Sequence, residues 1–190
     1  MSSCKTSSYF ENIERINYQL NLDKDYDSIL KKYRKDRKKS LRKAVEAKLD
    51  YQDFNTIDAL IKLYKEVFSH INTSDKYFTI IKNLMTFSLE NNKGFIRNIY
   101  VDKKLICSGF FARDKSRIYY LFAASNTQGR KFGATTFLIN SVIKEYSNSN
   151  FIFDFEGSTI PNVANFYKSF GSEETVYFNL KTNVFKRIFL

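Results

Sequence analysis

The chain has 190 residues, of which 43% are hydrophobic and 17% aromatic, so it is long enough and apolar enough for one folded domain and is not intrinsically disordered. Its formal net charge of +11 favours anionic partners such as nucleic acid, anionic membrane or phosphorylated ligands. One histidine and two cysteines, Cys4 and Cys107, exclude a metal site of clustered His and Cys and do not support a disulfide framework. The leader lacks the apolar core of a secretion signal and no apolar run approaches a membrane span, so we expect a cytoplasmic protein.

The N-terminal half is predicted to be mainly helical. Residues 1–16 are expected to form a flexible leader and residues 17–190 a single domain. A strand is predicted at Tyr18–Leu22, and a long helix at about Asp25–Lys48 because its apolar residues recur at helical spacing. A short strand and two further helices are predicted to follow, at Leu49–Phe54, Thr56–Ser69 and Ser74–Glu90.

The long predicted helix carries most of the basic excess of the chain. Residues 31–48 contain ten Lys or Arg against two acidic residues, a local excess of eight positive charges. Such a run forms either a solvated helix face or a contact surface for nucleic acid or anionic membrane. Arg37 falls within the apolar stripe of the helix and therefore needs an anionic partner or a route to solvent. Arg37 is thus the candidate substrate-binding residue.

Beyond Gly94 the pattern changes to strands. Three strand-like runs separated by short polar turns predict an antiparallel meander, at Phe95–Val101, Lys104–Arg113 and Arg117–Ala124. The remaining predicted elements are a helix at about Lys131–Tyr146, a buried strand through Phe151–Phe155, a helix from Pro161 to a stop at Gly171, a strand at Glu174–Leu180 and a closing helix at Val184–Leu190.

The glycine loop, residues 123–134, joins the third meander strand to a helix. Its two glycines, its backbone donors and the start of a new helix favour binding of phosphate oxygens, although an ordinary surface loop has the same pattern. The candidate cofactor-binding residues are Ala123, Ala124, Ser125, Gly129, Arg130, Lys131, Gly133 and Ala134.

Two carboxylates at the end of the buried strand are candidate catalytic groups. Asp154 and Glu156 are two residues apart, so strand geometry predicts that both lie on one face, opposite Phe153 and Phe155. They are either a general base with an orienting carboxylate or the acidic partners of structural ion pairs. Tyr167, on the following helix, is either a general acid or a core aromatic residue.

The order of these elements resembles the Gcn5-related N-acetyltransferase (GNAT) fold. Arg130-Lys131-Phe132-Gly133-Ala134 is similar to the family's loop, although the second small residue comes one position early, and Phe166-Tyr167-Lys168-Ser169-Phe170-Gly171 is similar to its later motif. The resemblance implies an α/β (α+β) fold with a mixed, mostly antiparallel central sheet flanked by helices. It also implies acetyl-CoA or another acyl-CoA as donor substrate, backbone amides that hold its diphosphate, and Tyr167 as general acid.

The segments Arg37-Lys38-Lys39-Ser40-Leu41-Arg42-Lys43-Ala44 and Asp154-Phe155-Glu156-Gly157-Ser158 resemble the FemABX-like branch of bacterial aminoacyltransferases, whose second domain this chain looks like. That resemblance implies an acyl or aminoacyl donor, including aminoacyl-tRNA, and an amine acceptor that is a small molecule or a cell-wall precursor. Glu156, with Asp154 second, is then the candidate base. Two alternatives remain: a non-catalytic basic module that binds RNA or anionic lipid, and a degenerate transferase scaffold.

Overall fold

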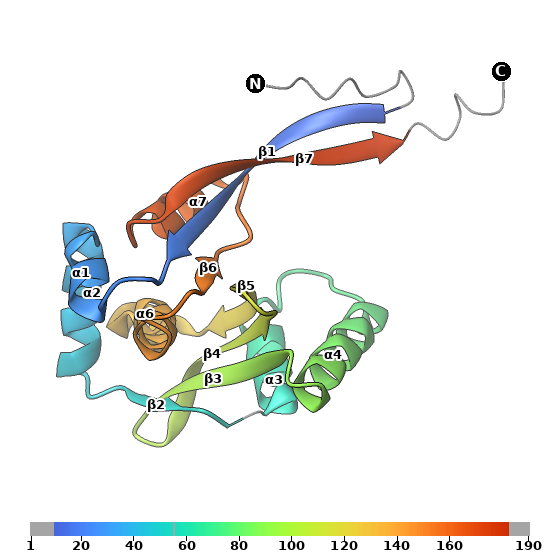
Figure 1. The fold of residues 1–190 in the computed structure, drawn as a ribbon. Coiled ribbons are helices and arrows are strands. Elements are labelled where there is room, and N and C mark those ends of the chain that lie inside the picture. The colour runs from blue at the N-terminus through green and yellow to red at the C-terminus, as the bar shows by residue number, and fades with distance from the viewer. Residues whose placement is uncertain (1–9, 55, 183–190) are drawn as a thin grey trace, which may run out of the picture.

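The computed structural model describes residues 10–54 and 56–182, and within them seven strands form one sheet in the order β2-β3-β4-β5-β6-β1-β7 (Figure 1). The strands are β1 (Phe10–Asn21), β2 (Asp50–Gln52), β3 (Gly94–Val101), β4 (Lys104–Arg113), β5 (Arg117–Ser125), β6 (Ile152–Asp154) and β7 (Glu173–Thr182). The helices are α1 (Tyr26–Lys31), α2 (Lys35–Glu46), α3 (Ile57–Val67), α4 (Asp75–Glu90), α5 (Thr127–Phe132), α6 (Ala134–Glu145) and α7 (Pro161–Lys168).

The sheet is antiparallel at every junction except one. β3, β4 and β5 pair as the antiparallel meander that the sequence predicted, and β2 pairs antiparallel with the outer edge of β3. β5 and β6 run parallel, because the chain crosses over through α5 and α6 between them. β1 returns between β6 and β7 and is antiparallel to both. The fold is therefore the mixed, mostly antiparallel α/β sheet flanked by helices that the sequence predicted.

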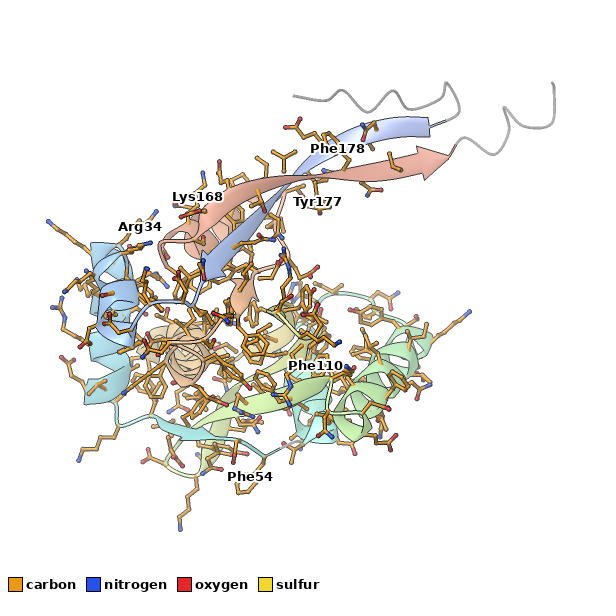
Figure 2. All side chains as sticks on the ribbon, viewed as in Figure 1. Arg34, Phe54, Phe110, Lys168, Tyr177 and Phe178 are labelled. Atoms are coloured by element: carbon orange, nitrogen blue, oxygen red, sulfur yellow. The ribbon has the colours of Figure 1, made fainter. Side chains whose placement is uncertain are left out.

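Helices cover the two faces of the sheet. Alternate residues of one strand point to opposite faces, so Phe111 joins the core beneath α1, α2, α6 and α7, whereas Phe110 joins a smaller core with Leu60 of α3 and Met85 of α4. Figure 2 shows Phe110 beside these two helices. Each face of the meander is thus buried, as its long apolar runs require.

The predicted long helix at Asp25–Lys48 is two helices, α1 and α2. The chain leaves the helix at Lys32 and becomes extended at Arg34, whose backbone N–H donates to the Ser169 carbonyl oxygen at 3.0 Å. The break buries Tyr33, whose ring packs edge-on against Phe170 with 5.1 Å between centroids. Burial of this aromatic ring outweighs the continuity of one helix, and local spacing does not reveal the contact with Phe170.

The prediction of a flexible leader at residues 1–16 is wrong for residues 10–16, because these residues belong to β1 and pair with β7. The two strands form a ribbon that extends beyond the rest of the sheet (Figure 1). Tyr177 and Phe178 project from this ribbon and are 47% and 55% exposed (Figure 2). The predicted helix at Val184–Leu190 and the first nine residues lie outside the described residues.

Candidate functional site

The site begins where two parallel strands separate. β5 pairs with β6 only through Arg117–Tyr119, while β5 itself continues to Ser125. From Tyr120 onward, β5 has no strand partner on that side within the described part of the chain. On its other side the register with β4 skips Leu121, which forms a bulge. The separation and the bulge leave backbone N–H groups of β5 free of the strand ladder, so they are available as hydrogen-bond donors.

Asp154 is the last residue of β6 and is buried, with 3% exposure. Its carboxylate accepts hydrogen bonds from Asn17 Nδ2 at 2.9 and 3.1 Å, Gln19 Nε2 at 2.9 Å, Arg117 at 3.0 Å and the Glu156 backbone N–H at 2.8 Å. These donors hold the carboxylate in one position. Such an arrangement fits a residue that positions its neighbours.

Glu156 lies beyond the end of β6, so the expected shared strand face with Asp154 is not formed. Its φ is 63°, a left-handed conformation that is costly for a residue with a side chain and that recurs at functional sites. Gly157 follows with φ 71° and packs against the backbone of Ile16. The turn directs Glu156 out of the strand, and its carboxylate has no hydrogen-bond partner within residues 10–54 and 56–182. Glu156 is exposed as a residue, but partial burial of its carboxyl group and, secondarily, the charge of Asp154 raise its pKa above the ordinary carboxyl value.

Tyr167 of α7 lies in an aromatic cluster beside the separated strands. Its ring centroid is 4.8 Å from that of Phe155, 6.2 Å from that of Tyr18 and 6.4 Å from that of Tyr120. Burial raises the pKa of Tyr167, so the phenol stays protonated at neutral pH. The ring is therefore a packing residue, and its protonated phenol is also compatible with the predicted role of general acid.

Most residues of the glycine loop belong to regular secondary structure. Ala123, Ala124 and Ser125 complete β5, and Gly129, Arg130 and Lys131 belong to α5, a helix that was not predicted. Gly133, with φ 75°, separates α5 from α6, and Ala134 begins α6. The Asn126 side chain accepts a hydrogen bond from the Gly129 N–H at 2.9 Å and so closes the first turn of α5.

The loop residues turn inward, and α2 covers the start of α6. A Cβ at Gly133 would overlap Ser40 of α2, and a Cβ at Gly129 would overlap the Ile106 carbonyl oxygen. Arg130 donates to the Ser125 carbonyl oxygen at 2.8 Å, within its own loop. The Ser125 hydroxyl is buried without a hydrogen-bond partner among the described residues, and no open space adjoins it at Gly129. Ser40 of α2 therefore lies against Gly133, where α5 ends and α6 begins.

Arg37 connects three helices. Its guanidinium donates to Thr136 Oγ1 of α6 at 2.6 Å and lies 4.7 Å from the ring centroid of Phe166 on α7. Asp36 lies 3.6 Å from the same guanidinium, and the buried Nε has no partner within the described residues. Burial lowers the pKa of Arg37. The predicted interruption of an apolar stripe by a cation is thus present, and this cation faces α6 and α7.

Three side chains that hold the Asp154 carboxylate were not predicted from the sequence. They are Asn17, Gln19 and Arg117. Asn17 and Gln19 alternate along β1 two residues apart, a sign of one polar strand face, but their contact with β6 depends on the tertiary fold. Within the described ranges no group of three His, Cys, Asp or Glu residues could hold a metal ion. None of the helices in those ranges is long and apolar enough to cross a membrane.

The sequence of the chain was compared with family models and with curated protein sequences. A family model described as an acetyltransferase (GNAT) domain matches residues 30–168. No curated protein sequence matches the chain.

Solved structures share the fold at low sequence identity. FemX matches with a TM-score of 0.74 and 12% identity, over 95% of this chain and 68% of that one. A conserved protein of unknown function from Bacteroides thetaiotaomicron VPI-5482 matches with a TM-score of 0.62 and 12% identity, over 92% and 63%. The C-terminal domain (DUF2156) of a putative lysylphosphatidylglycerol synthetase from Agrobacterium fabrum matches with a TM-score of 0.61 and 11% identity, over 91% and 62%. The chain therefore spans about two thirds of the length of these structures.

Proposed function

Because this chain belongs to the acetyltransferase (GNAT) domain family, we propose that it transfers an acyl or aminoacyl group from a thioester or ester donor to an amine acceptor. The observation that carries the proposal is the separation of β5 from β6 beside Glu156 and Tyr167. Family membership supports acyl transfer in general, and the donor, the acceptor and the residue roles are our proposal.

Glu156 is proposed as the base. An amine attacks a carbonyl carbon only through its neutral form, so a proton must leave the ammonium group before or during attack. The Glu156 carboxylate has no competing donor within the described residues, and its raised pKa brings it nearer to that of the amine. Asp154, with four residues donating to it, holds the turn that carries Glu156.

The free edge of β5 is proposed to stabilise the tetrahedral intermediate. Attack converts the carbonyl oxygen into an oxyanion, which needs N–H donors in fixed positions. The bulge at Leu121 and the unpaired edge from Tyr120 to Ser125 offer such donors on a rigid strand. Loss of one donor of this kind typically costs about 10²- to 10³-fold in turnover.

Tyr167 is proposed to protonate the leaving group. Collapse of the intermediate breaks the bond to the thiolate or alkoxide, and the phenol donates its proton to that atom while the acyl group stays on the amine. The surrounding rings fix the phenol and exclude water from one side of it.

Two donors remain in the proposal, acyl-CoA and aminoacyl-tRNA, and both are expected in the cytoplasm. Ser40 of α2 lies against Gly133 at the start of α6, and we take this contact to favour an aminoacyl ester donor over a coenzyme A donor. Exposed cations of α2, such as Lys39 and Lys43, support a tRNA partner. A small-molecule or cell-wall-precursor amine is the proposed acceptor.

Mass spectrometry of the acceptor tests the function directly. The protein is incubated with aminoacyl-tRNA or acyl-CoA and a panel of amines, and an acyl mass gained by one amine supports the proposal. The proposal fails if the folded protein consumes neither class of donor above the rate of the Glu156→Gln, Tyr167→Phe double variant. Calorimetry with coenzyme A and a salt titration of tRNA binding then separate the donors, since tRNA affinity falls steeply with salt.

A further inference from the structure

A concave pocket lies between α1, α2 and α6. It encloses about 410 Å³, within the range of roughly 300–1,000 Å³ that small-molecule sites occupy. None of its lining residues belongs to β5, β6 or α7, so it is separate from the proposed acyl-transfer site. It therefore needs an explanation of its own.

The walls of this pocket are mainly apolar. Leu30 of α1, Leu41 and Val45 of α2 and Phe137 of α6 line it. Val45 is 67% exposed although it lies beside this apolar surface. A ligand with an aliphatic chain would remove these side chains from water, and burial of this apolar surface would favour binding.

A buried amide supplies the pocket with hydrogen-bond donors. Asn140 of α6 is 6% exposed, and its Oδ1 accepts a hydrogen bond from the Tyr26 hydroxyl at 3.1 Å. Its Nδ2 has no partner within residues 10–54 and 56–182. The buried side-chain atoms without a partner in these ranges are Tyr33 Oη, Arg37 Nε and Ser125 Oγ, so the Asn140 NH₂ group keeps access to solvent and is free to donate to a ligand oxygen.

On the α2 side, the pocket is lined by two basic residues, Lys38 and Arg42, and one acidic residue, Glu46. Each of the three is one helical turn from the next. Lys38 Nζ donates to the Lys31 carbonyl oxygen at 2.9 Å, and Arg42 has no carboxylate partner among the residues described. The net charge of the lining is positive, and its uncompensated part lies at the Lys38 and Arg42 end. A negatively charged oxygen is the group that this end would attract.

We propose that this pocket binds an anionic amphiphile, in which an aliphatic chain contacts Leu30, Leu41, Val45 and Phe137 while a carboxylate or phosphate lies near Arg42 and Lys38. Asn140 donates to an oxygen of the same ligand. This chemistry has two sources, a free single-chain acid or phosphate ester and a lipid in an anionic membrane. The inference does not rest on the proposed acyl transfer.

A tryptophan placed at the pocket reports binding. The chain contains no tryptophan, so Val45→Trp creates a single fluorophore at the pocket wall. Octyl phosphate and octanoate are expected to shift its emission saturably, and octan-1-ol and octylammonium to bind at least about tenfold more weakly. In the unsubstituted protein, octyl phosphate is expected to raise the melting temperature through binding to the folded state. Equal responses to the anionic, neutral and cationic compounds would overturn the proposal.

Two matched double charge reversals distinguish ligand binding by the pocket from ligand binding by the overall positive charge of α2. Lys38→Glu with Arg42→Glu is expected to weaken octyl phosphate binding about tenfold or more, and Asn140→Leu to weaken it while octan-1-ol is little affected. Lys39→Glu with Lys43→Glu makes the same charge change on exposed α2 residues outside the pocket lining, and it is expected to change affinity less than threefold. If both double variants weaken binding equally, the charge of the helix and not the pocket binds the ligand, and the proposal is wrong.

Vesicles distinguish the two sources. A saturable response to monomeric octyl phosphate supports a free amphiphile. A response to phosphatidylglycerol vesicles that phosphatidylcholine vesicles do not produce, and that the Lys38 and Arg42 reversal abolishes, supports a membrane lipid. Absence of a response to both the monomeric anions and the anionic vesicles, together with an unchanged melting temperature of the unsubstituted protein, rejects the site.

Discussion

The Arg117 guanidinium lies 3.0 Å from the Asp154 carboxylate and joins β5 to β6 at the place where the two strands separate. The Asp154 side chain is 4% exposed, whereas that of Arg117 is 33% exposed. Asn17 and Gln19 of β1 donate to the same carboxylate, so this one group connects three strands. The open edge of β5 is therefore bounded by a fixed polar junction.

Asp154→Ala is expected to lower the free energy of unfolding by about 3–5 kcal/mol, because it leaves Arg117 and several N–H donors without their acceptor. Asp154→Asn keeps an acceptor oxygen and is expected to cost less. Urea unfolding measures both losses. Asp58→Ala removes the exposed ion pair with Lys82 and serves as control, with an expected loss below about 1 kcal/mol. Equal losses at the two aspartates would contradict a structural role for the junction.

Glu156→Gln is expected to lower turnover by about 10²- to 10⁴-fold, since the amide cannot accept the proton of the amine. In the parent protein the rate should fall as pH drops through a pKa above the ordinary carboxyl value, the direction in which burial and Asp154 move Glu156. Because the raised pKa penalises the charged form in the folded state, the penalty is absent below the unfolded-state pKa and present at neutral pH. Thermal unfolding at neutral pH should therefore find Glu156→Gln at least as stable as the parent. A normal rate in this variant removes Glu156 from the mechanism.

Tyr167→Phe keeps the ring that packs on Phe155 and Tyr120 but removes the proton. We expect turnover to fall by at least about tenfold with an unchanged melting temperature, and the loss to be largest for donors with poor leaving groups. Rates with thioester donors of increasing leaving-group pKa measure this trend. Tyr177→Phe removes an exposed hydroxyl on β7 and should change neither rate nor stability. If Tyr167→Phe is fully active with every donor, Tyr167 is a packing residue alone.

The fold was predictable where local pattern and tertiary packing agree. The three meander strands and the left-handed stop at Gly171 follow from periodicity and turn chemistry. These features depend on neighbours in sequence, so a single chain is sufficient to predict them.

The site was less predictable because its decisive contacts are long-range. Periodicity placed Glu156 on a strand face, but the chain turns there with φ 63°. Ser40 contacts Gly133 although the two residues are about ninety positions apart in the sequence. A glycine pattern does not distinguish a glycine that lies against a bound phosphate from one that lies against another helix. Candidate residues such as Glu156 and Tyr167 could be proposed from the sequence, but their geometry and the three side chains that hold Asp154 could not.

Gly133→Ala tests the contact between α2 and α6. Gly133 has φ 75°, and an added Cβ would meet both Ser40 Oγ and the Ser40 carbonyl oxygen, the latter at 2.9 Å. We expect a loss of about 1–3 kcal/mol in urea unfolding from backbone strain and overlap. Adding Ser40→Gly should recover only part of it, because the carbonyl oxygen remains. A full-stability Gly133→Ala variant would indicate that α2 does not rest on the start of α6.

Substitution of Arg37 tests whether this cation has only a structural role or also binds the acceptor. Arg37→Met keeps an apolar stem beside Phe166 but removes the hydrogen bond to Thr136 and the charge. If the arginine only joins α2 to α6 and α7, unfolding should become easier by about 1–2 kcal/mol with KM unchanged. If it also binds an anionic acceptor, KM should rise about tenfold or more for that acceptor and remain constant for an uncharged analogue. Thr136→Val removes the same hydrogen bond without removing the charge, so it should reproduce the stability loss alone. A rise in KM for Arg37→Met that Thr136→Val does not share therefore assigns the acceptor contact to the guanidinium.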